Sequence, residues 1–276
     1  MTTQTMPNLD GWIPQKPDNR DYQLFERLPL LRFAAPPPSV SPLTTALSIL
    51  DQGNLGSCTA YGSGKAFRYL DRQAGTDFDV SELAQYYNSR LEMGAQYVSQ
   101  DSGATIRDSV KALAKYGMAR ESDWPYVISK FSQTPPSAAY DFAAKHQALE
   151  YVTVNNNVNE VKLAIAAGYP VIIGFTVYQN YQQGFASGIW PEPQGAAVGG
   201  HCVLLDGYDA SYVMFPNSWG TGVGVGGRFR MSWAYLLNNG ADFWILKKIE
   251  EDNPAPTPPP PTPPAVIPHY FSGIRY

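Results

Sequence analysis

The chain has 276 residues, a formal net charge of −4 and 44% hydrophobic residues, so it can bury a large core as one large domain or as two lobes. The slightly acidic balance and the lack of a clustered Lys/Arg run argue against a nucleic-acid partner. The sequence contains no membrane span and no basic start followed by an apolar run, so we expect a protein that stays inside the cell, unless a leader is missing.

Residues 1–38 form an extension ahead of the main domain. Prolines interrupt this segment, and it ends in the run PPP at 36–38, which is typical of a hinge. The segment lacks an obvious long helix. We therefore place a domain boundary after residue 38 and expect a single large domain from 39 to 250.

The stretch 51–62, which reads DQGNLGSCTAYG, predicts a polar loop followed by a helix that runs to Gly75. Ser57 is a plausible N-cap. Cys58 would then lie in the first turn, where free backbone N–H groups and the helix dipole favour a negative charge. Cys58 is therefore a candidate nucleophile, and Gln52 is close enough on the loop to be an oxyanion donor.

Two further helices are predicted in the first half of the chain. Apolar residues recur at helical spacing after Ser81 and again after Thr105, and Asp108 is positioned to complete a capping box with Thr105. Gly117 ends the second of these helices. The first half of the chain is therefore mostly helical.

The second half is rich in strands from about residue 147. A helix is predicted from Asn157, with Glu160 at its third position. The apolar runs typical of strands lie at 151–154, 171–175, 203–208, 229–231 and 243–246. A helical lobe followed by a strand lobe is an α+β arrangement, and a cleft between lobes is a usual place for a site.

The strand lobe supplies the groups that a thiol nucleophile needs. His201 follows two glycines at the head of a predicted strand, and Asn217 lies where a later strand breaks into a Gly-rich loop. A cysteine nucleophile needs a base, and the base needs a partner on its other ring nitrogen. Asn217 can orient the ring of His201 while staying neutral, and Trp219 can shield their hydrogen bond from water.

The cysteines and histidines limit the other chemistry. Cys58 and Cys202 are the only cysteines. We expect both to stay unpaired, because a nucleophile in a disulfide cannot react. We expect Cys202 to be a small core residue on a strand. His146, His201 and His269 have no ligand spacing, and no C-x-x-C or H-E-x-x-H motif is present. We therefore expect no metal and no cofactor.

Four segments between about residues 40 and 248 resemble the papain family of cysteine proteases. They are QGNLGSC at 52–58, the block from Ser102-Gly103 to the WPY at 124–126, GGH with GYD at 199–209, and NSWG at 217–220. The resemblance implies a papain-like two-lobe α+β fold. It places a helical lobe at about 45–147 and a β-barrel-like lobe at about 148–250, with the active-site cleft between them.

The resemblance also implies roles for single residues. Cys58 would be the nucleophile, His201 the general base and then acid, and Asn217 the residue that orients His201. Gln52 and the backbone N–H of Cys58 would stabilise the oxyanion. The main chain at Ser102 and Gly103 would pair with the bound peptide, and Gly200 and Trp219 belong to the same substrate-binding surface.

The implied activity is that of a cysteine endopeptidase that hydrolyses a peptide or protein substrate through a thioester acyl-enzyme. The sequence leaves two alternatives open. One is a catalytically silent binding or scaffolding protein, which is suggested by Thr59 in place of the family's aromatic residue and Val223 in place of a tryptophan. The other is a peptide ligase, which differs only in whether an amine or water intercepts the thioester.

The two ends of the chain carry separate hypotheses. Members of this family commonly have a preceding segment that lies across the cleft, so we expect residues 1–38 to pack on the enzyme and to restrict access to Cys58. Residues 251–276 form a Pro-rich spacer with an aromatic end. We expect this tail to dock on its own enzyme or on a partner, the alternative being a flexible tail with exposed aromatic residues.

Overall fold

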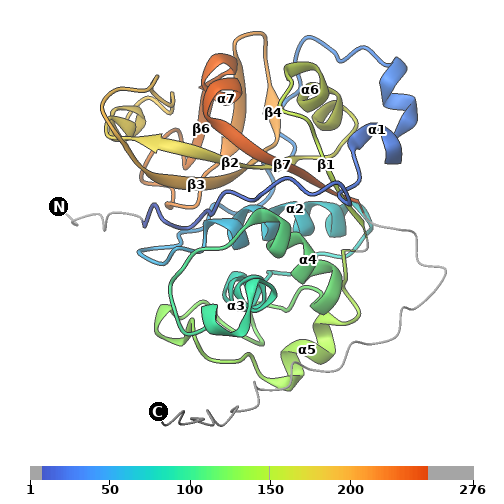
Figure 1. Ribbon diagram of the computed structural model, residues 1–276, viewed down its shortest axis with the longest axis vertical. Helices are drawn as coiled ribbons and strands as arrows, with labels where there is room; N and C mark the ends of the chain where they lie inside the picture. The colour runs from blue at the N-terminus through green and yellow to red at the C-terminus, as the bar shows by residue number, and fades with distance from the viewer. Residues whose placement is uncertain (1–7, 149, 248–276) are drawn as a thin grey trace, which may run out of the picture.

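The computed structural model describes residues 8–148 and 150–247, in which a helical lobe faces a strand lobe (Figure 1). The helical lobe contains α2 (Cys58–Gln73), α3 (Glu82–Met93), α4 (Ile106–Tyr116) and α5 (Ser137–Ala143). Helices α6 (Val158–Ala166) and α7 (Trp233–Asn239) lie with the strands (Figure 1). The α+β class predicted from the sequence is confirmed. No described helix is long and apolar enough to cross a bilayer.

The predicted helix starts are confirmed by their caps. The side chain of Ser81 accepts a hydrogen bond from the backbone N–H of Ala84 at the start of α3, and Thr105 accepts one from Asp108 at the start of α4. Ser57 does precede α2, but its side chain makes no capping bond. Its hydroxyl lies 2.6 Å from that of Tyr126 instead, so Ser57 is the N-cap residue of α2 by position, as predicted, but without a side-chain bond.

The strands form two antiparallel sheets. The larger has the order β1-β7-β2-β3 and the smaller β4-β5-β6. Their bounds are β1 (Glu150–Thr153), β2 (Val171–Tyr178), β3 (Ala197–Leu205), β4 (Gly207–Tyr208), β5 (Tyr212–Pro216), β6 (Arg228–Ser232) and β7 (Gly240–Lys247). Within the described residues these sheets do not close into a barrel, so the strand lobe is barrel-like only in part.

Asp206 explains why the run 203–208 is two strands rather than one. Its buried carboxylate accepts hydrogen bonds from Arg228 at 2.6 and 2.7 Å and from the backbone N–H of Thr44 at 3.1 Å. These bonds hold Asp206 between β3 and β4. The charge is therefore paired, as a buried carboxylate requires, and Asp206 has a structural role.

Strand β2 is buried on both faces, which accounts for its continuous apolar sequence. Ile173 and Phe175 point into the core of the strand lobe, whereas Ile172 belongs to the cluster that joins the two lobes. Alternate residues of a strand point to opposite faces of its sheet. The joining cluster also contains Cys58 and Cys202, so the cysteines lie where the lobes meet.

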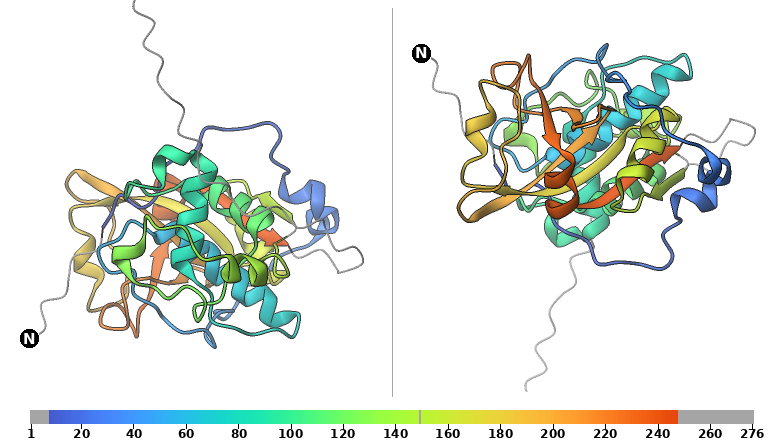
Figure 2. Two further views of the ribbon diagram at one scale, coloured as in Figure 1. Left: turned by 90° about the horizontal axis from the view of Figure 1, so that it is seen from below. Right: turned by 90° about the horizontal axis from the view of Figure 1, so that it is seen from above.

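The extension lies against both lobes. Its first described residues run between the strand layer and α2 (Figure 1), and the views in Figure 2 show the following part at the edge of the molecule. There the short helix α1 (Leu24–Arg27) packs near β1, and Leu24 is fully buried in the strand-lobe core. Arg107 on α4 pairs with Asp21. The tail at 251–276 lies outside the described residues, so its docking stays a prediction.

Candidate active site

Cys58 occupies the first position of α2 and is completely buried. Burial raises the pKa of its thiol to about 12, whereas hydrogen bonds from the backbone at Cys202, Thr59 and Cys58 itself act to lower it. The bond at Cys202 joins the sulfur to β3, at the residue directly after His201. Folding has therefore brought Cys58 beside the strand that carries the candidate base.

His201 is oriented through one ring nitrogen. Its Nε2 lies 2.8 Å from Oδ1 of Asn217, and that oxygen also accepts the backbone N–H of Ser218 at 2.8 Å. Because the oxygen can only accept, Nε2 carries the hydrogen. The other ring nitrogen, Nδ1, is buried without a hydrogen-bond partner among the described residues. Nδ1 is thus the atom left to take a proton from a thiol.

Trp219 lies over this pair, as the sequence suggested. Its ring centroid is 4.7 Å from that of His201, with a tilt of 31° between the rings, and its side chain is 4% exposed. An apolar cover lowers the local dielectric constant and strengthens the hydrogen bond between His201 and Asn217. Trp219 therefore shields the base from water.

Burial of His201 leads to a pH prediction. We expect its ring to stay neutral down to a pH of about 4, because burial lowers its pKa to about 4 even though the bond to Asn217 raises it. An unfolded imidazole takes up its proton near 6.5, so the unfolded chain binds more protons between these values. The folded chain should lose stability as the pH falls from about 6.5 to 4. Titration of the imidazole protons by NMR measures the pKa of His201, whose signal is assigned by its loss in the His201→Gln variant. A midpoint near pH 6.5 would contradict the lowered pKa.

Gln52 is fully buried and is held in place by Ser218. Its Oε1 accepts the hydroxyl of Ser218 at 2.6 Å, and its Nε2 donates to the carbonyl of Leu55 at 2.9 Å. An amide nitrogen carries two hydrogens, so one donor remains for an oxyanion. Gln52 is therefore tied to the residue that follows Asn217.

The two walls of the cleft come from different lobes, and residues 8–13 lie between them. On the strand lobe the backbone N–H of Gly200 donates to the carbonyl of Leu9 at 2.7 Å. On the helical lobe Ala104 donates to the carbonyl of Gly11 at 3.1 Å and accepts from the N–H of Ile13 at 3.0 Å. An extended segment thus pairs with both walls at once.

Gly11 lies directly over the thiol. A Cβ atom at this position would lie 2.6 Å from Sγ of Cys58 and 3.0 Å from the backbone of Gly56. Real Cβ atoms do not come this close, so only glycine lets the segment pass here. The predicted substrate-binding residue Gly103 is just as crowded, because a Cβ there would overlap the backbone of Asp10 and Gly11.

Ser102 and Asp101 brace this wall. The hydroxyl of Ser102 donates to the carbonyl of Gly103 at 3.0 Å. Asp101 accepts the backbone N–H of Gly56 at 3.0 Å and the hydroxyl of Tyr86 at 2.6 Å, and Tyr86 in turn accepts the N–H of Gly103 at 3.0 Å. We did not predict Asp101 or Tyr86, because no local motif marks contacts between distant segments.

The two positions at which this chain departs from the papain family, Thr59 and Val223, are buried. Thr59 and Val223 are 0% and 2% exposed, and Val223 belongs to the strand-lobe core. Cys58 and Cys202 are both free and buried, as expected. These substitutions therefore change the packing under the site and leave its polar groups in place.

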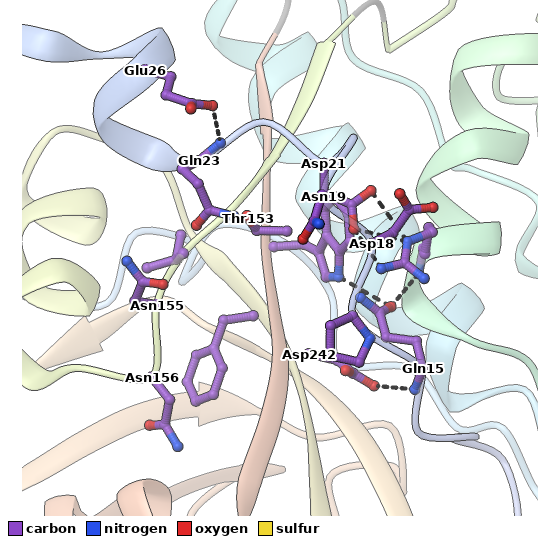
Figure 3. Close-up of a pocket in the computed structure, with 15 residues that line it drawn as sticks. Gln15, Asp18, Asn19, Asp21, Gln23, Glu26, Thr153, Asn155, Asn156 and Asp242 are labelled. Atoms are coloured by element: carbon purple, nitrogen blue, oxygen red, sulfur yellow. Dashed lines mark hydrogen bonds and ion pairs between the residues drawn. The ribbon is translucent and has the colours of Figure 1, made fainter.

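A cavity of about 470 Å³ lies next to the extension, lined among others by Gln15, Asp21 and Asp242 (Figure 3). Neither Cys58 nor His201 lines it. Acidic side chains of the extension supply much of its polar lining (Figure 3). The cavity is therefore separate from the thiol and the imidazole.

Comparison with known proteins places the chain in a family. Residues 42–242 match the family described as papain family cysteine protease. The chain belongs to this family. Xylellain, a cysteine protease from Xylella fastidiosa, is 32% identical with a TM-score of 0.80, and the match covers 90% of this chain and 100% of xylellain.

Two other relatives agree with this assignment. An uncharacterized peptidase C1-like protein of Acanthamoeba polyphaga mimivirus is 31% identical, over 91% of this chain and 90% of its own length. Papain from Carica papaya is 25% identical, over 66% of this chain and 50% of its own length. The chain is thus a papain-like cysteine peptidase, as the motifs indicated.

Proposed function

We infer that this papain-family peptidase cleaves peptide bonds with Cys58 as nucleophile and His201 as proton carrier. The arrangement of His201 supports this most strongly. Its Nε2 is fixed on Asn217 at 2.8 Å, while its Nδ1 has no other partner among the described residues. The Cys58 sulfur contacts the backbone of the next residue on β3. A base aligned in this way can accept the thiol proton.

The reaction follows from these positions. The sulfur of Cys58 attacks the peptide carbonyl carbon while Nδ1 of His201 takes the thiol proton. The N–H of Cys58 and the spare N–H of Gln52 stabilise the negative oxygen. His201 returns the proton to the departing amine, which leaves a thioester. Water, deprotonated by the same ring, then releases the acid and restores the thiol.

The extension holds this site closed. Residues 8–13 pair with Gly200 and Ala104, and Gly11 covers the sulfur. With Cys58 and His201 both at 0% exposure, burial disfavours the thiolate and the imidazolium alike. The chain described here is therefore the inactive form, and displacement of the extension is the step that activates it.

The two alternative functions, scaffolding and peptide ligation, differ from hydrolysis in whether an oxygen atom of water enters the product. A scaffolding protein would have no need for the Asn217 bond or for an unpartnered Nδ1 on His201. A ligase would pass the acyl group to an amine. We expect digestion of an unfolded protein in ¹⁸O-labelled water, by a Gly11→Val chain whose extension is displaced from the thiol, to place ¹⁸O in the new carboxyl ends, as mass spectrometry can show. Products that are joined rather than labelled would favour the ligase.

A further inference from the structure

Trp12 follows Gly11 in the bound segment, and its side chain fills a slot between the lobes. The side chain is only 7% exposed. Gly200 and Gly174 form two of the walls: a Cβ at Gly200 would lie 2.6 Å from ring carbon Cε3, and one at Gly174 would overlap the indole. Neither glycine has a left-handed φ. Their lack of a side chain therefore makes room for a ring.

The slot ends at a carboxylate. Oδ2 of Asp242 accepts the indole N–H of Trp12 at 3.0 Å and the backbone N–H of Gln15 at 3.0 Å, the second of which is drawn in Figure 3. Both donors belong to the extension. Burial raises the pKa of Asp242 while these two bonds lower it. Displacing the extension therefore leaves a half-buried carboxylate that needs new donors.

We propose that this slot is the specificity pocket of the open enzyme and that Asp242 makes it select an arginine side chain of the substrate. The inference rests on the peptidase function above. Trp12 lies next to the residue over Cys58, so a side chain in the slot lies beside the bond that is cut. A guanidinium is planar like an indole, and it brings both hydrogen-bond donors and a positive charge to the carboxylate.

Arg107 on α4 is the cation of the enzyme that could compete for Asp242. It lines the same cavity as Asp242, and its charge lowers the pKa of that carboxylate. In this structure its guanidinium is held by Asp21 and donates to the carbonyl of Lys16 at 2.9 Å. These partners lie beyond Trp12 in the extension. A test should therefore empty the slot while keeping Asp21 in place.

The full-length double variant Gly11→Val, Trp12→Ala meets this need. The valine clashes with Cys58, the alanine vacates the slot, and the pair between Asp21 and Arg107 is left unaltered. We would compare fluorogenic peptides that carry arginine, citrulline or leucine at one of the three positions before the cut. Citrulline has nearly the shape of arginine without its charge. It therefore separates charge from size.

We expect the arginine peptide to have a kcat/KM about tenfold or more above the citrulline peptide at one of these positions, as a charged hydrogen bond implies. Adding Asp242→Asn to the double variant should bring the ratio of kcat/KM between the arginine and citrulline peptides close to one. Asparagine suits this site because it tolerates the φ of 56° at Asp242. Adding Gly174→Ala, which narrows the slot without touching the carboxylate, should lower the rates of the arginine and leucine peptides alike.

Four outcomes would contradict the specificity pocket or the peptidase function. A preference for leucine, or an arginine preference that survives Asp242→Asn, would overturn the specificity pocket and leave the peptidase function standing. Unchanged rates with Gly174→Ala would also overturn the pocket. No hydrolysis of any peptide, together with no labelling of Cys58 by a thiol-alkylating epoxide, would overturn the peptidase function itself. A melting curve for each variant shows that it is folded.

Discussion

A full-length chain with Gly11→Val is expected to cleave a fluorogenic peptide about 10- to 100-fold faster than the unaltered chain. The Cβ atom at residue 11 would lie 2.6 Å from the sulfur of Cys58, so the segment has to move away from the thiol. Overpacking a tight contact costs roughly 1–3 kcal/mol, and each 1.4 kcal/mol changes an equilibrium about tenfold. The initial rate at equal enzyme concentration measures the effect.

The matched control is Gly222→Val. A Cβ at Gly222 would have no heavy atom within 4 Å, and neither Gly11 nor Gly222 has a left-handed φ. Both substitutions therefore add the same side chain to a glycine, but only the one at Gly11 meets the nucleophile. Equal rates for the Gly11→Val chain and the unaltered chain would show that the extension does not control access to Cys58.

Replacing Cys58 by alanine in the Gly11→Val chain is expected to lower kcat/KM by a factor of about 10⁴ or more. No other group in the proposed mechanism can form the thioester, and loss of a nucleophile in such enzymes has effects of this order or larger. Hydrolysis of the same fluorogenic peptide, followed over a long incubation, measures the residual rate.

Cys202→Ala, made in the same Gly11→Val chain, is the matched control for Cys58→Ala. Both cysteines are free, and both are buried at the junction of the lobes. Cys202 contributes its backbone to the site, and alanine keeps that backbone. We expect this variant to retain activity to within about tenfold, since losing one sulfur from a core causes modest destabilisation. If Cys202→Ala were as inactive as Cys58→Ala, the nucleophile would be misassigned.

Local sequence signals were sufficient for α2, α3 and α4 of the first lobe and for the approximate places of most strands of the second lobe. The hydroxyls of Ser81 and Thr105 cap α3 and α4 as predicted, because a capping bond depends on neighbours only three residues apart. Burial on both faces explains why β2 reads as one apolar run. The split at Asp206 was not predictable, since it depends on Arg228 and Thr44 from other segments.

The chemistry of the site was predictable, and the family resemblance led us to expect the extension over Cys58, but not which of its residues lie there. The motifs identified the thiol, the imidazole and the amide, and the structure places the last two 2.8 Å apart. The sequence did not reveal that Gly11 and Trp12 lie in the cleft or that Asp242 receives the indole. A Gly-Trp pair inside a Pro-broken extension was the available signal, but its meaning depends on contacts with both lobes.

The most direct test of the account is labelling by an epoxide that alkylates thiols activated by an imidazole. In the Gly11→Val chain we expect intact-mass spectrometry to show one added equivalent, which peptide mapping locates on Cys58. The same chain with His201→Ala should react at least tenfold more slowly, because the proton acceptor is gone. No adduct in the Gly11→Val chain, or an adduct on Cys202 alone, would contradict the assignment of Cys58 and His201 as the reacting pair.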